Sequence, residues 1–292
     1  MDIRSIGIGL LFAFIWASAF TSAVIIVADA APLAALAFRF LVSGLIGVAI
    51  ALMLGESWRL TRGQWRATIV FGICQNAIYL GLNFVAMQTV EASLAAIIAS
   101  TMPLMVAAAG WAALGDRLPW FGVLGLFTGF VGVAVIMSAR MSAGFDAYGV
   151  ALCVIAAAAL AVATLSMRGA SSGGNLMMVV GLQMLFGAVA LAIASALTEE
   201  VYVTLSTRWV LAFIYTTLAP GLLATWLWFT LVQRIGAVRA ATFHFLTPFF
   251  GVAIAALILG EALGPRDVLG VAIIMAGILA VQLSKQKTVS EP

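Results

Sequence analysis

The sequence contains ten apolar runs, each close to the roughly 20 residues that a membrane-spanning helix needs. Backbone N–H and C=O groups cannot stay unpaired in hydrocarbon, so runs of this kind form helices rather than open strands. The sequence therefore predicts an all-α integral membrane protein with ten transmembrane helices. The predicted helices cover residues 5–27, 32–54, 66–88, 92–114, 119–138, 148–168, 176–197, 208–232, 237–259 and 266–284.

The composition agrees with this interpretation. Of the 292 residues, 64% are hydrophobic and 9% are charged, whereas a soluble domain carries about 25% charged residues. Ten spans leave no room for a large soluble domain. The few basic residues lie between apolar runs and form no basic stripe, so we expect a lipid bilayer and a small molecule as partners, and no nucleic acid. A monomeric form is compatible with the sequence.

Several kinds of chemistry are excluded by residue counts. His244 is the only histidine, so a site with several histidine ligands to a metal cannot form. Cys74 and Cys153 lie inside apolar runs and are expected to be small buried side chains. The only lysines are Lys285 and Lys287 near the end, so no phosphate-binding P-loop is present. We expect no cofactor, no metal and no catalytic residues.

The basic residues predict an orientation. If the N-terminus is cytoplasmic, ten of the 14 basic residues fall on the cytoplasmic side, three fall on the opposite side, and Arg39 lies within a span. Short cytoplasmic loops of membrane proteins are enriched in Lys and Arg. The sequence therefore predicts that both termini are cytoplasmic, as an even number of spans also requires.

The second half of the chain repeats the first half at an offset of 145 residues. This register pairs Pro103 with Pro248 and residues 115–118 with residues 260–263. Matched prolines and turn residues are harder to obtain by chance than matched Ala or Leu. The sequence therefore predicts an internal repeat.

Each repeat holds five predicted spans, an odd number, so the second repeat crosses the membrane in the opposite direction from the first. The predicted boundaries are 1–140 for the first repeat and 141–292 for the second. Inverted repeats are the usual construction of secondary transporters, with the substrate near the bilayer midplane.

A set of motifs resembles a known family. The motifs are Trp16-Ala17-Ser18-Ala19-Phe20, Phe38-Arg39-Phe40, the prolines of the fourth and ninth spans, the turns at 115–118 and 260–263, and the glycines Gly122, Gly125, Gly129 and Gly132. In this order they resemble the ten-span branch of the drug/metabolite transporter superfamily, the EamA family, and within it the YddG-type exporters of aromatic amino acids. The resemblance implies ten helices around a central cavity, lined by spans 1, 3, 4, 6, 8 and 9. It also implies efflux of amino acids across a bacterial inner membrane by alternating access.

Matched prolines are the first candidate site residues. Pro103 and Pro248 fall near the middle of the fourth and ninth spans, where a proline removes a backbone hydrogen bond. Such breaks at membrane depth point to a transport site, although a kink can also serve packing alone. Ser100 and Thr101 precede Pro103 and could contact substrate or bond a neighbouring helix.

The third span carries a polar stripe within an arc of roughly 100°. The stripe consists of Gln75, Asn76, Tyr79 and Asn83. It faces either the substrate cavity or a neighbouring helix, because a polar stripe is costly in lipid. The first two residues align in the repeat with Pro220 and Gly221, which predicts a break in the eighth span at the same level.

Deep aromatic residues complete the predicted site. Trp16, Trp226 and Trp228 lie inside spans, away from the interface where Trp is enriched. They could line a substrate cavity or fill helix interfaces. His244, one turn before Pro248, could bind substrate or accept a proton, or could be a neutral histidine bonded between helices.

The charged residues within the predicted spans bear on how transport is driven. Arg39 lies about 10 Å from the outer end of its span, so we expect it to snorkel as an ion pair or interface anchor rather than to clamp a carboxylate. Asp267 is the second residue of the tenth predicted span, and no other Asp or Glu lies within a predicted span. The absence of a carboxylate from the middle of the spans argues against obligatory proton antiport.

The sequence thus predicts a multi-pass transporter of a bacterial inner membrane that exports aromatic and other neutral amino acids by facilitative alternating access. The alternative is a multidrug or metabolite efflux transporter of the same superfamily. An intramembrane hydrolase is disfavoured because the sequence has no Gly-x-Ser-x-Gly elbow beside its hydroxyl residues.

Overall fold

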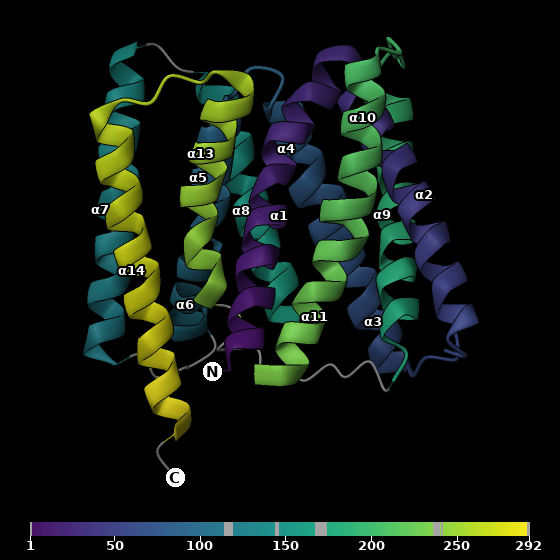
Figure 1. Cartoon of the computed structure of the whole chain (residues 1–292), viewed down its shortest axis with the longest axis horizontal. Coiled ribbons are helices and arrows are strands. Elements are labelled where there is room, and N and C mark those ends of the chain that lie inside the picture. The colour runs from purple at the N-terminus through teal and green to yellow at the C-terminus, as the bar shows by residue number, and fades with distance from the viewer. Residues whose placement is uncertain are drawn as a thin grey trace. The chain divides into compact units, whose positions relative to one another are not determined.

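The computed structural model describes residues 2–113, 119–143, 146–166, 174–235, 240 and 242–290. In these ranges the chain is helical with short connections, and the only strand-like pairing is an isolated bridge between Ala30 and Val203 (Figure 1). The predicted all-α class is confirmed.

The α-helices have the following bounds: α1 Ile3–Asp29, α2 Pro32–Met53, α3 Arg62–Phe71, α4 Leu80–Ala86, α5 Ala92–Ser100, α6 Met102–Ala113, α7 Trp120–Ala143, α8 Ala147–Ser166, α9 Leu176–Thr198, α10 Thr207–Thr216, α11 Ala224–Ile235, α13 Thr247–Leu259 and α14 Pro265–Ser290. Three further segments have another helical geometry: the π-helices η1 Gly72–Tyr79 and η2 Thr217–Leu223, and the 3₁₀-helix η3 Thr242–Leu246.

Within the described residues, eight helices or joined helices are long and apolar enough to cross a membrane, and they match the first eight predicted spans. The predicted ninth span corresponds to a shorter apolar helix, Phe243–Leu259. The predicted tenth span lies in α14, which has 26 residues. The total of ten spans stays a prediction.

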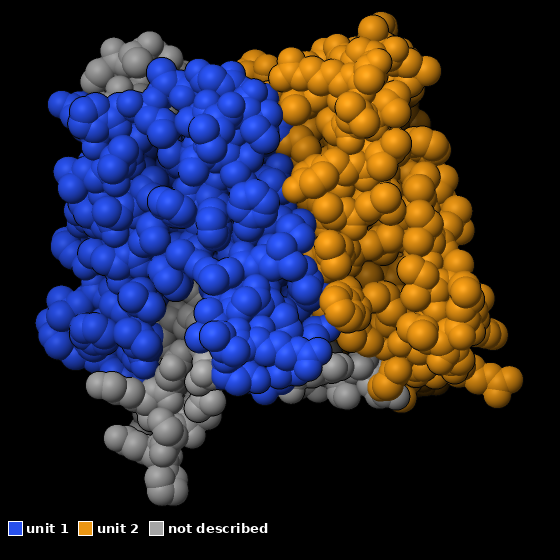
Figure 2. All heavy atoms as spheres, viewed as in Figure 1, with its two compact units in different colours: residues 1–21, 90–147, 227–292 blue, residues 22–89, 148–226 orange. Residues whose placement is uncertain are grey.

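The chain forms two compact units, which Figure 2 shows in two colours. Unit 1 contains residues 1–21, 90–147 and 227–292, and unit 2 contains residues 22–89 and 148–226. Each unit draws segments from both halves of the sequence, so neither half is a compact body by itself.

In unit 1, α7 and α14 pack through glycines, and Figure 1 shows them side by side. A Cβ atom on Gly125 would lie 2.8 Å from the carbonyl oxygen of Gly277, and one on Gly132 would lie 2.9 Å from that of Gly270. Small residues allow this close approach of helix backbones in membranes. The contacts run in opposite chain order, so the two helices are antiparallel.

In unit 2, α2 and α9 form a similar pair. A Cβ atom on Gly47 would lie 3.1 Å from the Cα atom of Gly181, and one on Gly44 would lie 2.7 Å from the Leu185 side chain. These contacts also run in opposite chain order. The pair is therefore antiparallel as well.

Glutamates that follow each helix of this pair cap the other helix. The Glu199 carboxylate, just after α9, accepts hydrogen bonds from the backbone N–H groups of Leu33 at 2.8 Å and Ala34 at 3.0 Å, in the first turn of α2. The Glu56 carboxylate, after α2, accepts one from the N–H of Met178 in α9 at 2.8 Å. A carboxylate at a helix N-terminus pairs free N–H groups and interacts favourably with the helix dipole.

The same arrangement recurs in unit 1 at α5. The Glu261 carboxylate, just after α13, accepts hydrogen bonds from the N–H groups of Ala92 at 2.8 Å and Ser93 at 3.1 Å. The matching predicted turn at 115–118 lies outside the described residues. Three apolar helices thus begin at a carboxylate supplied by a distant part of the chain.

Candidate functional site

The matched prolines lie where unit 1 has its helix breaks. Thr101 separates α5 from α6, and Pro103 is the second residue of α6. The 3₁₀-helix η3 precedes α13, and Pro248 is the second residue of α13. A proline lacks the N–H that an uninterrupted helix would require at that position. Both predicted breaks are therefore present, 145 residues apart.

The hydroxyls beside Pro103 bond their own turn. Ser100 Oγ donates to the carbonyl oxygen of Ile97 at 2.6 Å, and Thr101 Oγ1 donates to that of Ile98 at 2.7 Å. Both side chains are buried. In this structure both hydroxyls bond the preceding turn of α5, at the helix break.

Three aromatic rings surround His244 in unit 1, and we call the four residues the His244 cluster: Phe12, Trp16, Trp228 and His244. Ring centroids of the first three lie 5.2, 5.9 and 5.1 Å from the imidazole centroid. Phe12 also lies 5.8 Å from Trp16 and 5.2 Å from Trp228. Three residues predicted separately from the sequence are thus brought together.

Three elements build the His244 cluster. Phe12 and Trp16 stand one turn apart on α1, Trp228 comes from α11, and His244 comes from η3. Gly9 of α1 allows η3 to come close, because a Cβ atom there would collide with the ring of Phe243. The break before α13 places His244 in a 3₁₀ turn, where its ring reaches α1.

The imidazole is the polar group of this cluster. His244 is 8% exposed and forms no hydrogen bond with any residue that the structure describes. A neutral imidazole offers one N–H donor and one acceptor nitrogen. The three rings offer aromatic surface beside the imidazole, and the imidazole offers hydrogen-bonding nitrogens.

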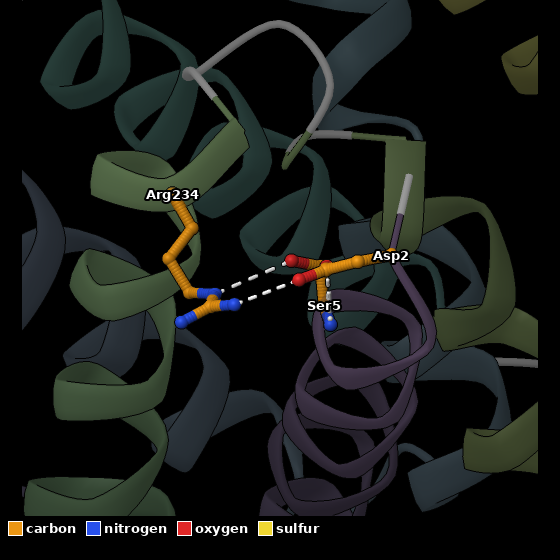
Figure 3. A network of polar contacts seen from close by, with 3 residues as sticks. All are labelled: Asp2, Ser5 and Arg234. Carbon is orange, nitrogen blue, oxygen red and sulfur yellow. Dashed lines mark hydrogen bonds and ion pairs between the residues drawn. The ribbon is translucent and has the colours of Figure 1, made fainter.

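A charged contact joins the first turn of α1 to the end of α11 (Figure 3). Arg234 Nη2 donates to Asp2 Oδ2 at 2.8 Å, and Arg234 Nε donates to Ser5 Oγ at 3.3 Å. The N–H of Ser5 donates to Asp2 Oδ1 at 3.0 Å. Hydrogen bonds from Ser5 and from Arg234 lower the pKa of Asp2 from 3.8 to about 2. The contact links the two helices that carry Phe12, Trp16 and Trp228.

Unit 2 contains the π-helices η1 and η2, which occupy corresponding places in the predicted repeat. η1 begins at Gly72 and η2 begins at Thr217, again 145 residues apart. Pro220 and Gly221 lie inside η2, so the predicted break in the eighth span takes the form of a π-helix. Short π-helical segments inside α-helices are frequent at functional sites.

Two side chains of the polar stripe on η1 and α4 form hydrogen bonds within unit 2. Asn76 is 2% exposed, and its side-chain amide donates to the carbonyl oxygen of Gln183 in α9 at 3.0 Å. Asn83 Nδ2 donates to the carbonyl oxygen of Tyr79 at 2.8 Å. Tyr79 is 1% exposed, while Gln75 is half-buried. Of the two predicted roles of the stripe, Asn76 shows the contact with a neighbouring helix, α9.

Trp226 is placed differently from the other two indoles. It belongs to unit 2, is 45% exposed and makes no ring contact with a described residue.

The structure corrects the expectation for Arg39. Its side chain is 4% exposed and does not snorkel, and no described carboxylate forms an ion pair with it. The guanidinium carbon lies 4.4 Å from the ring centroid of Phe40. The expectation failed because α2 packs against α9 and η2, and Arg39 Nη2 lies 3.8 Å from the Cβ position of Gly221 in η2.

The sequence reasoning missed two features. Phe12 is 1% exposed and contacts every other ring of the His244 cluster. Its spacing of four residues from Trp16 is a signal that could have found it, since such residues share a helix face. The contact between Asp2 and Arg234 had no local signal. In the described part of the chain, no group of three or more His, Cys, Asp or Glu side chains is placed to hold a metal.

Comparison with protein families finds two matched segments. The model of the EamA-like transporter family matches residues 3–138 and 147–283. The two segments together cover most of the chain.

Proteins named as transporters match this chain over most of their own length. The uncharacterized transporter YvbV of Bacillus subtilis is 28% identical over 254 residues, covering 86% of this chain and 82% of the relative. The uncharacterized inner membrane transporter YedA of Escherichia coli K12 is 25% identical over 295 residues, covering 97% and 93%. A solved crystal structure has a TM-score of 0.71 at 20% identity over 99% of this chain and 100% of that chain, which shows a shared fold.

Proposed function

Because the chain belongs to the EamA-like transporter family, we propose that it is a secondary transporter of a bacterial inner membrane that exports aromatic and other neutral amino acids. The coarser conclusion follows from the family itself: the chain is a multi-pass membrane transporter. Its bacterial relative YedA is named as an inner membrane transporter. The substrate class rests on the site.

The His244 cluster is the observation that carries this substrate class. Three aromatic rings have their centroids within 5.9 Å of the imidazole centroid. Aromatic rings stack favourably on other rings and on aliphatic side chains. The imidazole can bond the polar end of the same molecule. A neutral amino acid with an apolar side chain has both kinds of group.

Two inverted repeats, residues 1–140 and 141–292, would supply the movement. The twofold family match supports this division. So do the π-helices and proline breaks that recur at the 145-residue offset. Broken helices at the substrate site are typical of transporters that alternate between two openings. The charge bias of the loops supports cytoplasmic termini.

Export would be facilitative in this account. Apart from Asp267, the second residue of the tenth predicted span, no Asp or Glu lies within a predicted span, so no carboxylate of the kind that proton-coupled carriers use stands in the middle of one. The amino acid gradient would then be the driving force.

The experiment is counterflow into liposomes that contain purified protein and are preloaded with unlabelled substrate. Labelled phenylalanine should accumulate transiently without an imposed pH gradient. The competing panel includes serine, glutamate and a lipophilic cation such as tetraphenylphosphonium. Competition by the cation alone would favour the multidrug alternative, and absence of flux across the panel would contradict amino acid export.

Two matched variants test whether the transported substrate binds at the His244 cluster. Trp228→Leu alters the His244 cluster, whereas Trp120→Leu alters a 73% exposed indole at the start of α7. Only the first should raise the concentration of phenylalanine that gives half-maximal counterflow. Equal effects of the two variants would contradict this location.

A further inference from the structure

Arginines are concentrated where α2 connects to α3. The arginines of residues 55–66 are Arg59, Arg62 and Arg66. All three side chains are exposed, and none of their guanidinium groups forms a hydrogen bond or ion pair with a described residue. The only carboxylate of this segment, that of Glu56, accepts a hydrogen bond from the N–H of Met178. The segment therefore presents a positive charge that the described part of the chain does not neutralise.

This charge lies at the end of a membrane span. Residues Arg62–Ala86 are long and apolar enough to cross a membrane, and α3 begins at Arg62. The start of such a span lies near the level of the lipid headgroups. Trp58, in the connection, is 63% exposed, and Trp is enriched at the boundary between hydrocarbon and water. The arginines are therefore placed within reach of lipid phosphates.

The backbone that carries the arginines is held in place. Thr61 Oγ1 accepts a hydrogen bond from the N–H of Gln64 at 3.3 Å, and Gln64 Oε1 accepts one from the N–H of Thr61 at 2.8 Å. The N–H of Ser57 donates to Asn175 Oδ1 at 2.8 Å, which ties the connection to the residue before α9. All these residues belong to unit 2. The arginines are thus presented from an ordered segment within one compact unit.

One face of α3 changes from basic to apolar along the helix, and we call it the α3 face. It consists of Arg62, Arg66, Ile69 and Ile73, which are spaced four, three and four residues apart and so share a side of the helix. Ile69 is half-buried and Ile73 is 40% exposed. An adjacent face packs against α9, where the rings of Trp65 and Phe186 lie 6.1 Å apart. The α3 face is therefore left available to lipid.

We propose that the α3 face binds an anionic phospholipid. Arg62 and Arg66 hold the phosphodiester, because a guanidinium presents parallel N–H donors that match phosphate oxygens. Arg59 adds positive charge, which selects a lipid with a net negative charge such as phosphatidylglycerol over a zwitterionic one. An acyl chain lies along Ile69 and Ile73. This site is independent of the substrate proposed above.

The first test measures lipid binding by the purified full-length protein in detergent. The thermal midpoint is recorded as phosphatidylglycerol replaces phosphatidylcholine at constant total phospholipid. A saturable rise is expected for wild type. Arg66→Gln should weaken the apparent affinity for phosphatidylglycerol about fivefold, and the double variant Arg62→Gln/Arg66→Gln should weaken it about 25-fold. Arg62→Lys/Arg66→Lys keeps the charge but loses the two forks, and should weaken it about fivefold.

Arg208→Gln is the matched control for Arg66→Gln. Arg208 is also an exposed arginine of unit 2, at the start of α10 and of the apolar stretch Thr207–Trp228. Its loss should leave the apparent affinity unchanged. Equal losses in the two single variants, or no loss in the double lysine variant, would show diffuse attraction and overturn the site. A wild-type midpoint that does not respond to phosphatidylglycerol would overturn it without reference to any variant.

The second test distinguishes a lipid from a free phosphate. Inorganic phosphate and glycerophosphoglycerol, the headgroup without acyl chains, replace the lipid at constant ionic strength. Neither should raise the wild-type midpoint at millimolar concentration. A rise with either that matches the rise with phosphatidylglycerol would overturn the assignment to a lipid.

A second pair of variants tests the acyl chain. Ile73→Gln alters the apolar part of the α3 face and should weaken the apparent affinity for phosphatidylglycerol about threefold, as partial loss of apolar contact predicts. Leu211→Gln is the control, because it places the same side chain at a 64% exposed position of α10 in the same unit. Equal effects of the two variants would contradict a chain that lies along Ile69 and Ile73.

Discussion

The indole of Trp228 and the imidazole of His244 lie with their ring centroids 5.1 Å apart and their planes at 60°. This contact joins α11 to η3 across a stretch of chain whose residues 236–239 and 241 are not described. Phe12 lies 5.2 Å from each of these two rings, so three elements meet at one point. The site is therefore a tertiary feature, and its stability and its ligand binding can be tested separately.

Phe12→Ala should destabilise the protein strongly. The ring is 1% exposed and contacts three other rings, and loss of a buried Phe costs about 3 to 5 kcal/mol of unfolding free energy. The thermal midpoint in detergent measures this. Phe127→Ala removes a 71% exposed ring of α7 and should shift the midpoint much less. Equal shifts would show that Phe12 is not part of a packed cluster.

Gly277→Ala should disturb the pairing of α7 and α14. The new Cβ atom would collide with backbone atoms of Gly129, so the helices must separate; overpacking of this kind costs about 1 to 3 kcal/mol. Gly7→Ala is the control, because nothing lies within 4 Å of its Cβ position. The thermal midpoint should fall for the first variant only. An unchanged midpoint for Gly277→Ala would contradict the close contact.

Glu199→Gln should weaken the start of α2. The amide that replaces the carboxylate has one acceptor oxygen for the N–H groups of Leu33 and Ala34 and no charge for the helix dipole. The expected loss is about 1 kcal/mol. Hydrogen exchange at residues 33–36 should become faster. Glu200→Gln, at the exposed neighbouring position, should leave exchange unchanged, and a reversed order of the two variants would contradict the capping role.

The contact between Asp2 and Arg234 should persist across physiological pH. The pKa of Asp2 is lowered from 3.8 to about 2, so the stability that the carboxylate contributes is present above pH 3.8 and is lost as pH falls towards 2. The difference in thermal midpoint between wild type and Asp2→Asn should stay constant from pH 8 to pH 5. A difference that disappears between pH 7 and pH 5 would rule out this pKa.

Much of the fold could be predicted because a chain that crosses hydrocarbon must pair all its backbone N–H and C=O groups, and few structures do so. The first predicted span, 5–27, is the helix Ile3–Asp29, and the seventh, 176–197, is Leu176–Thr198. A proline also interrupts helical hydrogen bonding wherever it stands, so the breaks at Pro103 and Pro248 were predictable from the sequence alone.

Side-chain partners were harder to predict because they depend on packing between distant segments. The polar character of Asn76 was evident, but its bond to Gln183 depends on how η1 meets α9. Arg39 had the reach to snorkel, and its burial follows from the neighbours that cover α2. A hydropathy pattern fixes which residues are apolar and leaves their partners open.

The most direct test of the account measures phenylalanine counterflow by wild type and by His244→Phe in liposomes with equal amounts of protein. Phenylalanine at position 244 keeps a ring among Phe12, Trp16 and Trp228 but removes both ring nitrogens. The variant should fold, and its half-maximal phenylalanine concentration should rise about tenfold, as expected for the loss of one hydrogen bond of about 1.4 kcal/mol. Unchanged counterflow kinetics in His244→Phe would contradict the claim that this cluster binds the substrate.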